Sequence, residues 1–252
     1  MKKIRNLILF VLLPFYLFAQ DNHYNSQQFG SRASLLGGSV VAGLEDNSSM
    51  YYNPAALVFS ESNSLTIHTN AHSIEHVILK HGLGKDVASF SLRYIPLPQE
   101  VSAIINGNIE SRLKIGYTIL NKTNNNNDFS QRTSYFADLT TLFEGNEYYV
   151  GQLDLQNLIV ERWAGMCGSY KFSEKLSVGL TPFGSYRSQR YLYNLYSMLS
   201  SGPGASTPTV AYQRYYDALR LNVISIFFKA GIHYRTRKWR LGMTLTSPSI
   251  RI

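Results

Sequence analysis

The segment LKIGYTI, residues 113–119, decides the fold class, because apolar residues alternate strictly with polar or small ones along it. Successive side chains of a β-strand point to opposite faces, so this pattern is typical of a strand with one apolar and one polar face. Three further segments keep the same order, at residues 88–94, 176–181 and 239–246. The sequence therefore predicts an all-β protein.

Two stretches with the same glycine spacing predict β-hairpins. GSYKFSEKLSVG, residues 168–179, and GIHYRTRKWRLG, residues 231–242, each read as a strand, a tight polar turn and a returning strand. An Asn-rich stretch at 121–132 and a Tyr-rich stretch at 191–220 predict long loops. Short turns at one end and long loops at the other are typical of outer-membrane barrels. A soluble β-sandwich is the alternative, since it shows the same alternation.

The polar faces favour the barrel. They are rich in Gly, Ser and Thr, as expected of a barrel lumen, and no window after the first twenty residues is apolar enough for a transmembrane helix. Aromatic residues of the kind that form interfacial girdles lie near the strand ends, at Tyr94, Tyr117, Tyr170, Tyr186, Tyr234 and Trp239. We therefore expect an antiparallel transmembrane β-barrel over residues 58–252, with about eight strands.

The N-terminus predicts export. Residues 1–19, MKKIRNLILFVLLPFYLFA, combine Lys2, Lys3 and Arg5 with an apolar run and a small final residue, which is typical of a cleaved signal peptide. A membrane anchor is the alternative. Without those three cations the formal charge of +8 falls to +5, and the remaining basic residues form no run, which disfavours nucleic acid as a partner. Cys167 is the only cysteine, so no intramolecular disulfide can form.

The segment EDNSSMYYNPAALVF, residues 45–59, predicts two short capped helical turns. Asp46 or Ser48 can cap the first, which runs to Tyr52. Asn53 can cap the second, with Pro54 at its first position, where a missing N–H costs nothing. The alternative is an ordinary surface loop before the first strand.

GSRASLLGGSVVAGLEDNSSMYYNPAAL, residues 30–57, closely resembles the N-terminal region of the FadL/TodX family of outer-membrane transporters for long-chain fatty acids and other hydrophobic compounds. The resemblance is carried by Gly37, Gly38, Asp46, Asn47, Ser48, Tyr52, Asn53, Pro54 and Ala55. It implies that residues 20–57 form a hatch inside the barrel, with Asp46, Asn47, Tyr52, Asn53, Pro54 and Ala55 as its motif. It also implies capture of a hydrophobic ligand at the outer loops and its release sideways into the membrane.

The chain departs from the family in its length and therefore in its expected number of strands. Barrels of that family have about fourteen strands, so a chain with about eight is expected to be truncated at its C-terminus. A complete eight-stranded barrel is the competing interpretation, although its interior would be filled by side chains.

Candidate ligand contacts lie in the Tyr-rich stretch and at its base. Tyr191, Tyr193 and Tyr196 offer apolar area with a polar tip, and Arg187 and Arg190 can pair with a carboxylate. The alternative is that these residues simply pack an outer loop. The expected partners are a hydrophobic small molecule such as a fatty acid and the lipid of the bacterial outer membrane, with the chain as a monomer.

One pattern raises the possibility of an enzyme. HSIEH contains His72, Glu75 and His76 in the spacing of inverted zinc peptidases, which would hold zinc on a helix. On a strand, residues four apart are separated by roughly 13 Å, too far to bind one ion. The flanking sequence predicts a strand, so we expect no catalytic residues, no metal and no cofactor. The functional alternatives are a structural or secretion-associated barrel and, second, a zinc hydrolase.

Overall fold

The computed structural model describes residues 28–60, 65–69, 74–80, 83, 88–94, 98–105, 111–141, 145–203 and 209–252. The predicted signal peptide at 1–19 lies outside these residues. The described part consists mainly of antiparallel strands, with three short helices before them. This confirms the predicted all-β class. Among the described residues, no helix is long and apolar enough to cross a membrane.

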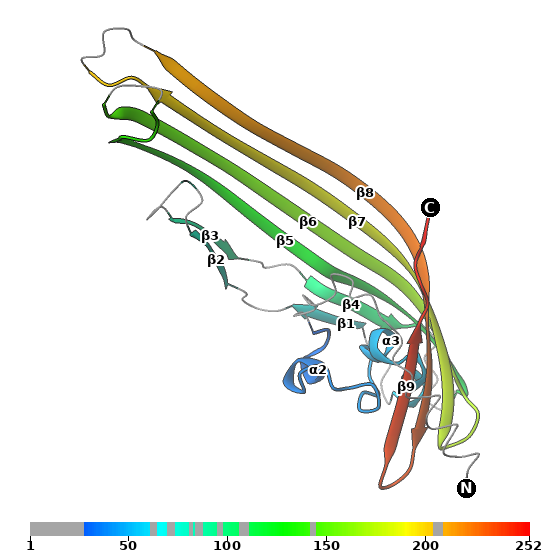
Figure 1. Cartoon of the computed structure of the whole chain (residues 1–252). Helices are drawn as coiled ribbons and strands as arrows, with labels where there is room; N and C mark the ends of the chain where they lie inside the picture. The colour runs from blue at the N-terminus through cyan, green and yellow to red at the C-terminus, as the bar shows by residue number, and fades with distance from the viewer. Residues whose placement is uncertain are drawn as a thin grey trace, which may run out of the picture.

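Eight strands form one sheet in the order β1–β4–β5–β6–β7–β8–β10, and β9 also pairs with β8 (Figure 1). Their bounds are β1 Leu65–Thr69, β4 Pro98–Ile104, β5 Leu113–Ala137, β6 Glu147–Lys171, β7 Leu176–Ser200, β8 Val210–Arg235, β9 Arg240–Thr246 and β10 Ile250–Arg251. A separate two-stranded sheet contains β2, Ile74–Lys80, and β3, Ala88–Tyr94. The four long strands β5 to β8 run side by side and curve together.

The alternating segments are all strands, and both predicted hairpins are confirmed. Residues 172–175 connect β6 to β7, and residues 236–239 connect β8 to β9. At the other end, longer connections at 138–146 and 201–209 join β5 to β6 and β7 to β8. The predicted difference between short turns at one end and longer connections at the other is therefore present.

Both predicted long loops are wrong in extent. Residues 121–132 form the middle of β5 and pair with β6, while residues 191–200 and 210–220 continue β7 and β8 as a paired hairpin. Asparagine has a low preference for strands, but pairing of residues 121–132 with β6 overrides that preference. The tyrosines and arginines proposed as ligand contacts therefore lie in a sheet and not in a loop.

A helix across the HSIEH pattern is also excluded where the structure describes it. Glu75 and His76 lie in β2, which pairs residue by residue with β3, and His72 lies outside the described residues. Consecutive strand residues point to opposite faces, so the helical spacing that a zinc site needs is not formed from residue 74 onward.

Near the short turns, several buried residues of one face of the sheet are polar, whereas exposed residues of the other face are apolar. On β7, Ser177 and Thr181 are fully buried, whereas Leu180 is 47% exposed. On β8, His233 is fully buried and the adjacent Ile232 is 50% exposed. We call the face with the buried polar residues the inner face and the other the outer face. Here the polar side chains contact the rest of the described chain, and the apolar side chains on the outer face are exposed.

Exposed apolar side chains form an uninterrupted run on the outer face, which we call the apolar band, and further exposed apolar residues such as Tyr216 and Tyr212 follow it beyond two polar positions. On β8 it runs along the outer face from Tyr234 to Ile224 and consists of Tyr234, Ile232, Ala230, Phe228, Ile226 and Ile224. Asn222 and Arg220 follow on the same face, so the band spans about eleven residues, close to the length of a tilted membrane-spanning strand. The remaining residues of the long strands lie beyond the band, toward the longer connections (Figure 1).

The N-terminal segment, residues 28–60, packs on the inner face near the short turns (Figure 1). It contains α2, Ser31–Leu35, α3, Ser49–Tyr52, and the 3₁₀ helix η2, Pro54–Phe59. The second predicted cap is confirmed, because the side chain of Asn53 accepts a hydrogen bond from the backbone N–H of Ala55 and Pro54 occupies the first helical position. The first turn begins after Ser48, whose N–H donates to Asp46 Oδ1.

Candidate functional site

The Asn-Pro-Ala segment lies directly on the sheet because two glycines make room for it. Gly179 of β7 and Gly231 of β8 are partners in the register. A Cβ atom at Gly179 would overlap the carbonyl carbon of Pro54, and one at Gly231 would overlap Oδ1 of Asn53. Any other residue at either position would therefore displace the N-terminal segment from the inner face.

Asn53 links three parts of the molecule through one side chain. Its Oδ1 caps η2, while its Nδ2 donates to the carbonyl oxygen of Val41 at 2.8 Å and to that of Ile232 in β8 at 3.1 Å. An amide is suited to this position because it supplies an acceptor and two donors at once. Aspartate would serve equally well as a cap, but it lacks the two N–H donors. This explains why asparagine precedes the proline.

Polar side chains of the inner face satisfy the carbonyl groups at the ends of the short helices. Such helices leave carbonyl groups without partners inside the helix, and burying them unpaired is costly. The donors and their carbonyl acceptors are Ser169 and Ser177 to Ala55, Thr181 to Met50, Thr244 to Tyr52, Lys229 to Tyr51 and Lys114 to Ser60. The polar half of the strand alternation thus has a structural role, namely holding the N-terminal segment.

Of the predicted motif residues, Asn47 contacts the β1–β4 edge of the sheet, and Asp46 contacts the neighbouring residue Ser48. Asn47 Nδ2 donates to Thr66 Oγ1 of β1 at 2.9 Å and to the carbonyl oxygen of Ser102 in β4 at 3.2 Å. Ser48 Oγ donates to Glu100 Oε2 at 3.2 Å, and Asp46 turns the chain by accepting the N–H of Ser48. The motif therefore connects β1 and β4 to β7 and β8 across the inner face.

An aromatic cluster lies between the N-terminal segment and the sheet on the side of the long strands. Phe183 and Phe227 stack at 5.3 Å, and Trp163 contacts Phe227 edge to face at 4.6 Å. The cluster consists of Phe29, Leu120, Phe183 and Phe227, with Tyr51, Tyr52 and Trp163 against it. Burial raises the pKa of the Tyr51 hydroxyl, with smaller contributions from Tyr52 and Glu161, so this hydroxyl stays protonated near neutral pH.

Two lysines enter this cluster, and Tyr51 touches both. Lys122 Nζ donates to Tyr51 Oη at 2.7 Å, and Lys229 Nζ donates to the carbonyl oxygen of Tyr51 at 2.6 Å. Lys229 Nζ also lies 4.1 Å from the centre of the Tyr51 ring, and Lys122 Nζ lies 5.3 Å from that of Trp163. The carboxylate of Glu161 accepts a hydrogen bond from Trp163 Nε1 of this cluster at 2.7 Å, so two cations face one anion and the remaining positive charge attracts a further anion. We call the cluster and its two lysines the aromatic–lysine site.

Lys122 enters this site at a β-bulge of β5. Asn121 pairs with Arg162, and Thr123 pairs with Glu161. Lys122 is therefore an extra residue of β5 that has no partner position in β6. Before the bulge the even-numbered residues of β5 face inward, as the buried Thr118 and Leu120 do, and Lys122 continues that series. The bulge changes the alternation of β5 only after Lys122, so that odd-numbered residues such as the buried Phe129 face inward beyond it.

Glu45 joins the N-terminal segment to the end of the sheet near the short turns. Its carboxylate lies 3.5 Å from Nε2 of the buried His233, 3.2 Å from Nη1 of Arg235 and 3.8 Å from Nη2 of Arg240. Burial acts to raise the pKa of the Glu45 carboxyl, but the contact with His233 and the charges of Arg240 and Arg235 outweigh it, so the pKa is lowered.

The structure separates the five candidate ligand contacts into two groups. Arg187, Tyr191 and Tyr193 are odd-numbered like the buried Phe183, and β7 has no register shift, so they lie on the inner face. Their inner-face neighbours are Glu161, whose carboxylate is 3.9 Å from Arg187, and Tyr215, whose ring meets that of Tyr193 edge to face.

Arg190 and Tyr196 are even-numbered residues of β7 and lie on the outer face. They are therefore not brought together with the other three residues. Arg190 lies opposite Arg220 of β8, beyond the apolar band.

Sequence reasoning missed Lys122, Lys229 and Glu45. Lys229 was within reach of the alternation, because Ser225, Phe227 and Lys229 follow one another on one face. Lys122 was within reach of the same signal, because Thr118, Leu120 and Lys122 follow one another on the inner face of β5.

Comparisons with protein-family models, with curated proteins and with solved structures found no match to this chain. The resemblance to the FadL/TodX family therefore stays a prediction that depends on the N-terminal motif. Among the described residues, no group of three or more His, Cys, Asp and Glu side chains is arranged to hold a metal ion.

Proposed function

We propose that this chain is a bacterial outer-membrane channel that takes up hydrophobic carboxylates, with long-chain fatty acids as the substrate class. In this proposal the long strands cross the membrane, the N-terminal segment is the hatch of the channel, and transport is passive. The ligand is captured on the inner face of the long strands and passes to the aromatic–lysine site, and movement of the hatch releases it sideways into the membrane.

The reversed exposure of the sheet carries the membrane part of the proposal. Leaving one Leu or Ile side chain in water instead of burying it costs about 1.5–3 kcal/mol, and the apolar band repeats such residues over several adjacent strands. A contiguous apolar surface of this kind is typical of a protein whose outer face meets lipid.

The aromatic–lysine site carries the substrate part. Aromatic rings provide an apolar contact for an acyl chain, and the ammonium groups provide charged donors for a carboxylate. An ammonium has three donors, and Lys229 uses one of them on the carbonyl oxygen of Tyr51. Because both lysines hold Tyr51, a carboxylate that draws them toward itself loosens α3, which couples ligand binding to the hatch.

Uptake of labelled oleate tests the proposal. Cells that lack the gene should take up less oleate than cells complemented with it, and the Lys122→Met and Lys229→Met variants should each restore only part of the difference. Lys80→Met is the matched control, because Lys80 is exposed on β2 and distant in sequence from the site. It should restore uptake fully at equal amounts of protein in the outer membrane.

Uptake of a neutral alkane separates the two parts of the proposal. Hexadecane has no carboxylate, so its uptake should depend on the gene but not on Lys122 or Lys229. If deletion of the gene changes the uptake of neither compound, the transport function is wrong and a structural or secretion-associated barrel becomes the better interpretation.

A further inference from the structure

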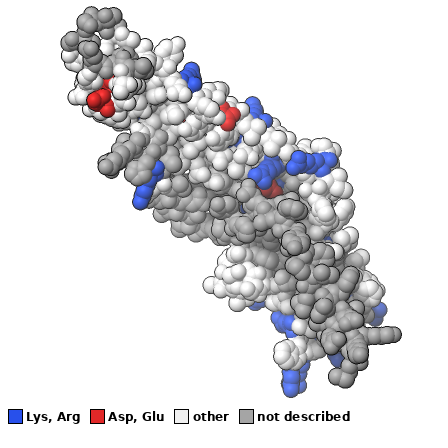
Figure 2. Space-filling model, viewed as in Figure 1, with Lys and Arg blue, Asp and Glu red and all other residues white. Residues whose placement is uncertain are grey.

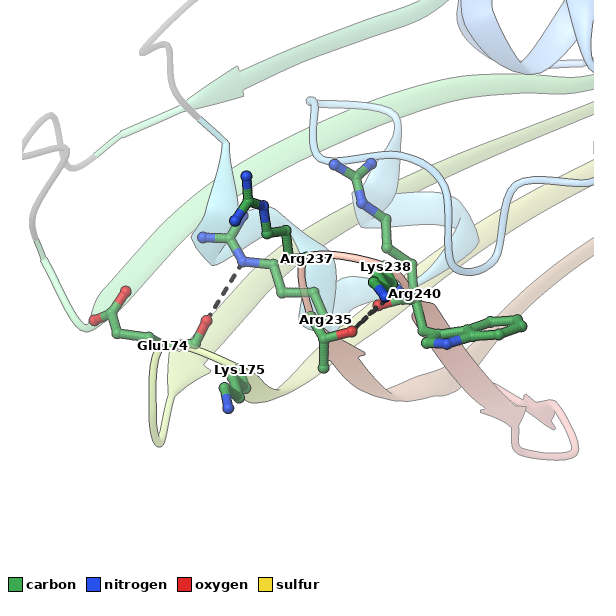
Figure 3. A pocket seen from close by; sticks show the side chains of 8 residues that line it. Glu174, Lys175, Arg235, Arg237, Lys238 and Arg240 are labelled. Atoms are coloured by element: carbon green, nitrogen blue, oxygen red, sulfur yellow. Dashed lines mark hydrogen bonds between the residues drawn. The ribbon is translucent and has the colours of Figure 1, made fainter.

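A cleft of about 580 Å³ lies at the short turns, outside the aromatic–lysine site. It is lined by two residues of the β6–β7 turn, Glu174 and Lys175, and by the β8–β9 turn with its flanking residues, 235–240. Figure 3 shows the guanidinium groups of Arg235, Arg237 and Arg240 extending from the turn toward the same side. We call this space the turn cleft.

The turn cleft has an excess of positive charge. Its lining contains five cations, Lys175, Arg235, Arg237, Lys238 and Arg240, and one acidic residue, Glu174. Lys and Arg side chains also gather at the lower end of the face drawn in Figure 2, where Figure 1 shows the short turns. Like charges held this close repel one another, so an anion in the cleft would stabilise the arrangement.

The acidic residues nearby are already engaged. Glu45 contacts Arg235 and Arg240, and the carboxylate of Glu174 lies 3.1 Å from Lys171, outside the cleft. In the part of the chain that the structure describes, no ion pair involves Arg237 or Lys238, and both side chains are exposed. These two cations are therefore available to an external anion.

The position of the cleft relative to the apolar band restricts the kind of anion. The band on β8 ends at Tyr234, and the cleft begins with the next residue. The last residue of the turn is Trp239, which is 71% exposed, and Leu241 of β9 is 59% exposed. Tryptophan and basic residues at the end of an apolar band are typical of the headgroup level of a membrane.

We infer that the turn cleft binds the phosphate of an anionic phospholipid in the leaflet next to the short turns. The inference rests on the proposed function, since it requires the apolar band to lie in the membrane. Arginine presents paired donors that match a phosphate, and the exposed apolar residues beside the cleft offer a surface for the acyl chains. A free phosphate ion would use the cations but would gain nothing from Trp239 and Leu241.

Fluorescence quenching by brominated lipids tests the inference. The chain has two tryptophans, so a Trp163→Phe background leaves Trp239 as the only one. The protein is reconstituted into phosphatidylcholine vesicles that contain a minor, equal fraction of brominated phosphatidylglycerol or brominated phosphatidylethanolamine. Brominated phosphatidylglycerol should quench Trp239 several-fold more strongly than brominated phosphatidylethanolamine does. In the Arg237→Gln/Lys238→Gln double variant, the ratio of quenching by the first lipid to quenching by the second should fall to about one.

A matched control separates the cleft from general charge. Arg132→Gln/Arg220→Gln removes the same charge from exposed positions beyond the other end of the apolar band and should leave the quenching ratio unchanged. Equal quenching by the two lipids in the unmodified cleft would overturn the inference and leave the proposed function intact. Loss of the preference on adding inorganic phosphate at the lipid concentration would also overturn it, in favour of a free-phosphate site. Absence of quenching by every brominated lipid would overturn both proposals, because the protein would not be inserted.

Discussion

Gly179 of β7 and Gly231 of β8 lie opposite each other in the sheet, and the Asn53–Pro54 peptide rests on the pair. Replacement of either glycine by alanine should destabilise the protein by about 1–3 kcal/mol, because the added Cβ overlaps the N-terminal segment and the tightly packed interface must shift. Thermal unfolding in detergent measures the loss. Increased protease cleavage within residues 28–60 would show that the segment has moved from the inner face.

Gly168 of β6 is the control for both substitutions. A Cβ atom there meets no atom within 4 Å, so Gly168→Ala adds the same methyl group to a neighbouring strand without a clash. It should leave thermal stability unchanged or slightly raised, since alanine restricts the unfolded chain. Equal effects at all three glycines would contradict the role assigned to the pair.

Replacing Asn53 should separate its function as a cap from its contact with β8. Asn53→Asp keeps the acceptor for the N–H of Ala55 but loses the donor to the carbonyl oxygens of Val41 and Ile232. Asn53→Ala loses both. We expect Asn53→Ala to cost about 1–3 kcal/mol, because the cap and the donor to two carbonyl groups are lost. Asn53→Asp should cost more although it keeps the cap, because its carboxylate is buried against the carbonyl oxygens of Val41 and Ile232. Equal stability of Asn53→Asp and the unmodified protein would show that the link to β8 contributes nothing.

Local chemistry explains which parts of this fold were predictable. The cap at Asn53 and the four-residue turns depend on residues adjacent in sequence, and both were predicted correctly. The outer half of β5 was not, because the asparagines at 124–127 have a low preference for strands and form one only through pairing with β6. The outer half of β7 was predicted as a loop although its tyrosines favour strands, and its pairing with β6 and β8 forms the strand.

The candidate site shows the same division. The alternation correctly predicts that residues such as Thr181 share one face, but it cannot say that this face meets the N-terminal segment. The position of the bulge at Lys122, and with it the inward direction of odd-numbered residues such as Phe129 beyond it, depends on where the register between β5 and β6 shifts, and that is a property of two strands together. The glycine spacing was visible in the sequence, yet only the structure distinguishes Gly179, which is in contact, from Gly168, which is not.

Deleting Lys122 should remove the bulge and preserve the rest of the sheet. Asn121 and Thr123 already pair with consecutive residues of β6, so the shortened strand continues the ladder without a gap. The ΔLys122 variant should therefore fold with near-normal thermal stability while losing the same part of oleate uptake as Lys122→Met. A deletion that prevents folding would contradict the assignment of Lys122 as the extra residue.

Acid should weaken the contact of Glu45 with the sheet. The pKa of this carboxyl is lowered in the folded protein from its ordinary value of 4.5. Its contribution to stability is therefore complete above about pH 4.5, where the carboxylate is also ionised in the unfolded chain, and is lost as the pH falls through the lower folded value. Thermal unfolding between pH 7 and pH 3 should show a steeper acid decline for the unmodified protein than for Glu45→Gln.

Glu174→Gln is the control for that measurement, because the Glu174 side chain is 82% exposed and its ion pair with Lys171 lies at the surface. It should keep the acid dependence of the unmodified protein. Parallel pH profiles for the unmodified protein and Glu45→Gln would show that the contact is energetically neutral.

The same substitution at two positions of β8 should distinguish a membrane-embedded outer face from a water-exposed one. Ala230 lies in the middle of the apolar band and Ala218 lies beyond it, and both are exposed on the outer face. In a bilayer, Ala230→Arg should cost about 2–4 kcal/mol and Ala218→Arg at most about 1 kcal/mol, because the cost of a cation on the lipid face depends on depth. In water, both substitutions would change stability by less than about 0.5 kcal/mol, as is usual at exposed positions. Unfolding by denaturant in lipid vesicles measures the difference, and equal, small effects at the two alanines would remove the basis for placing the apolar band in the membrane.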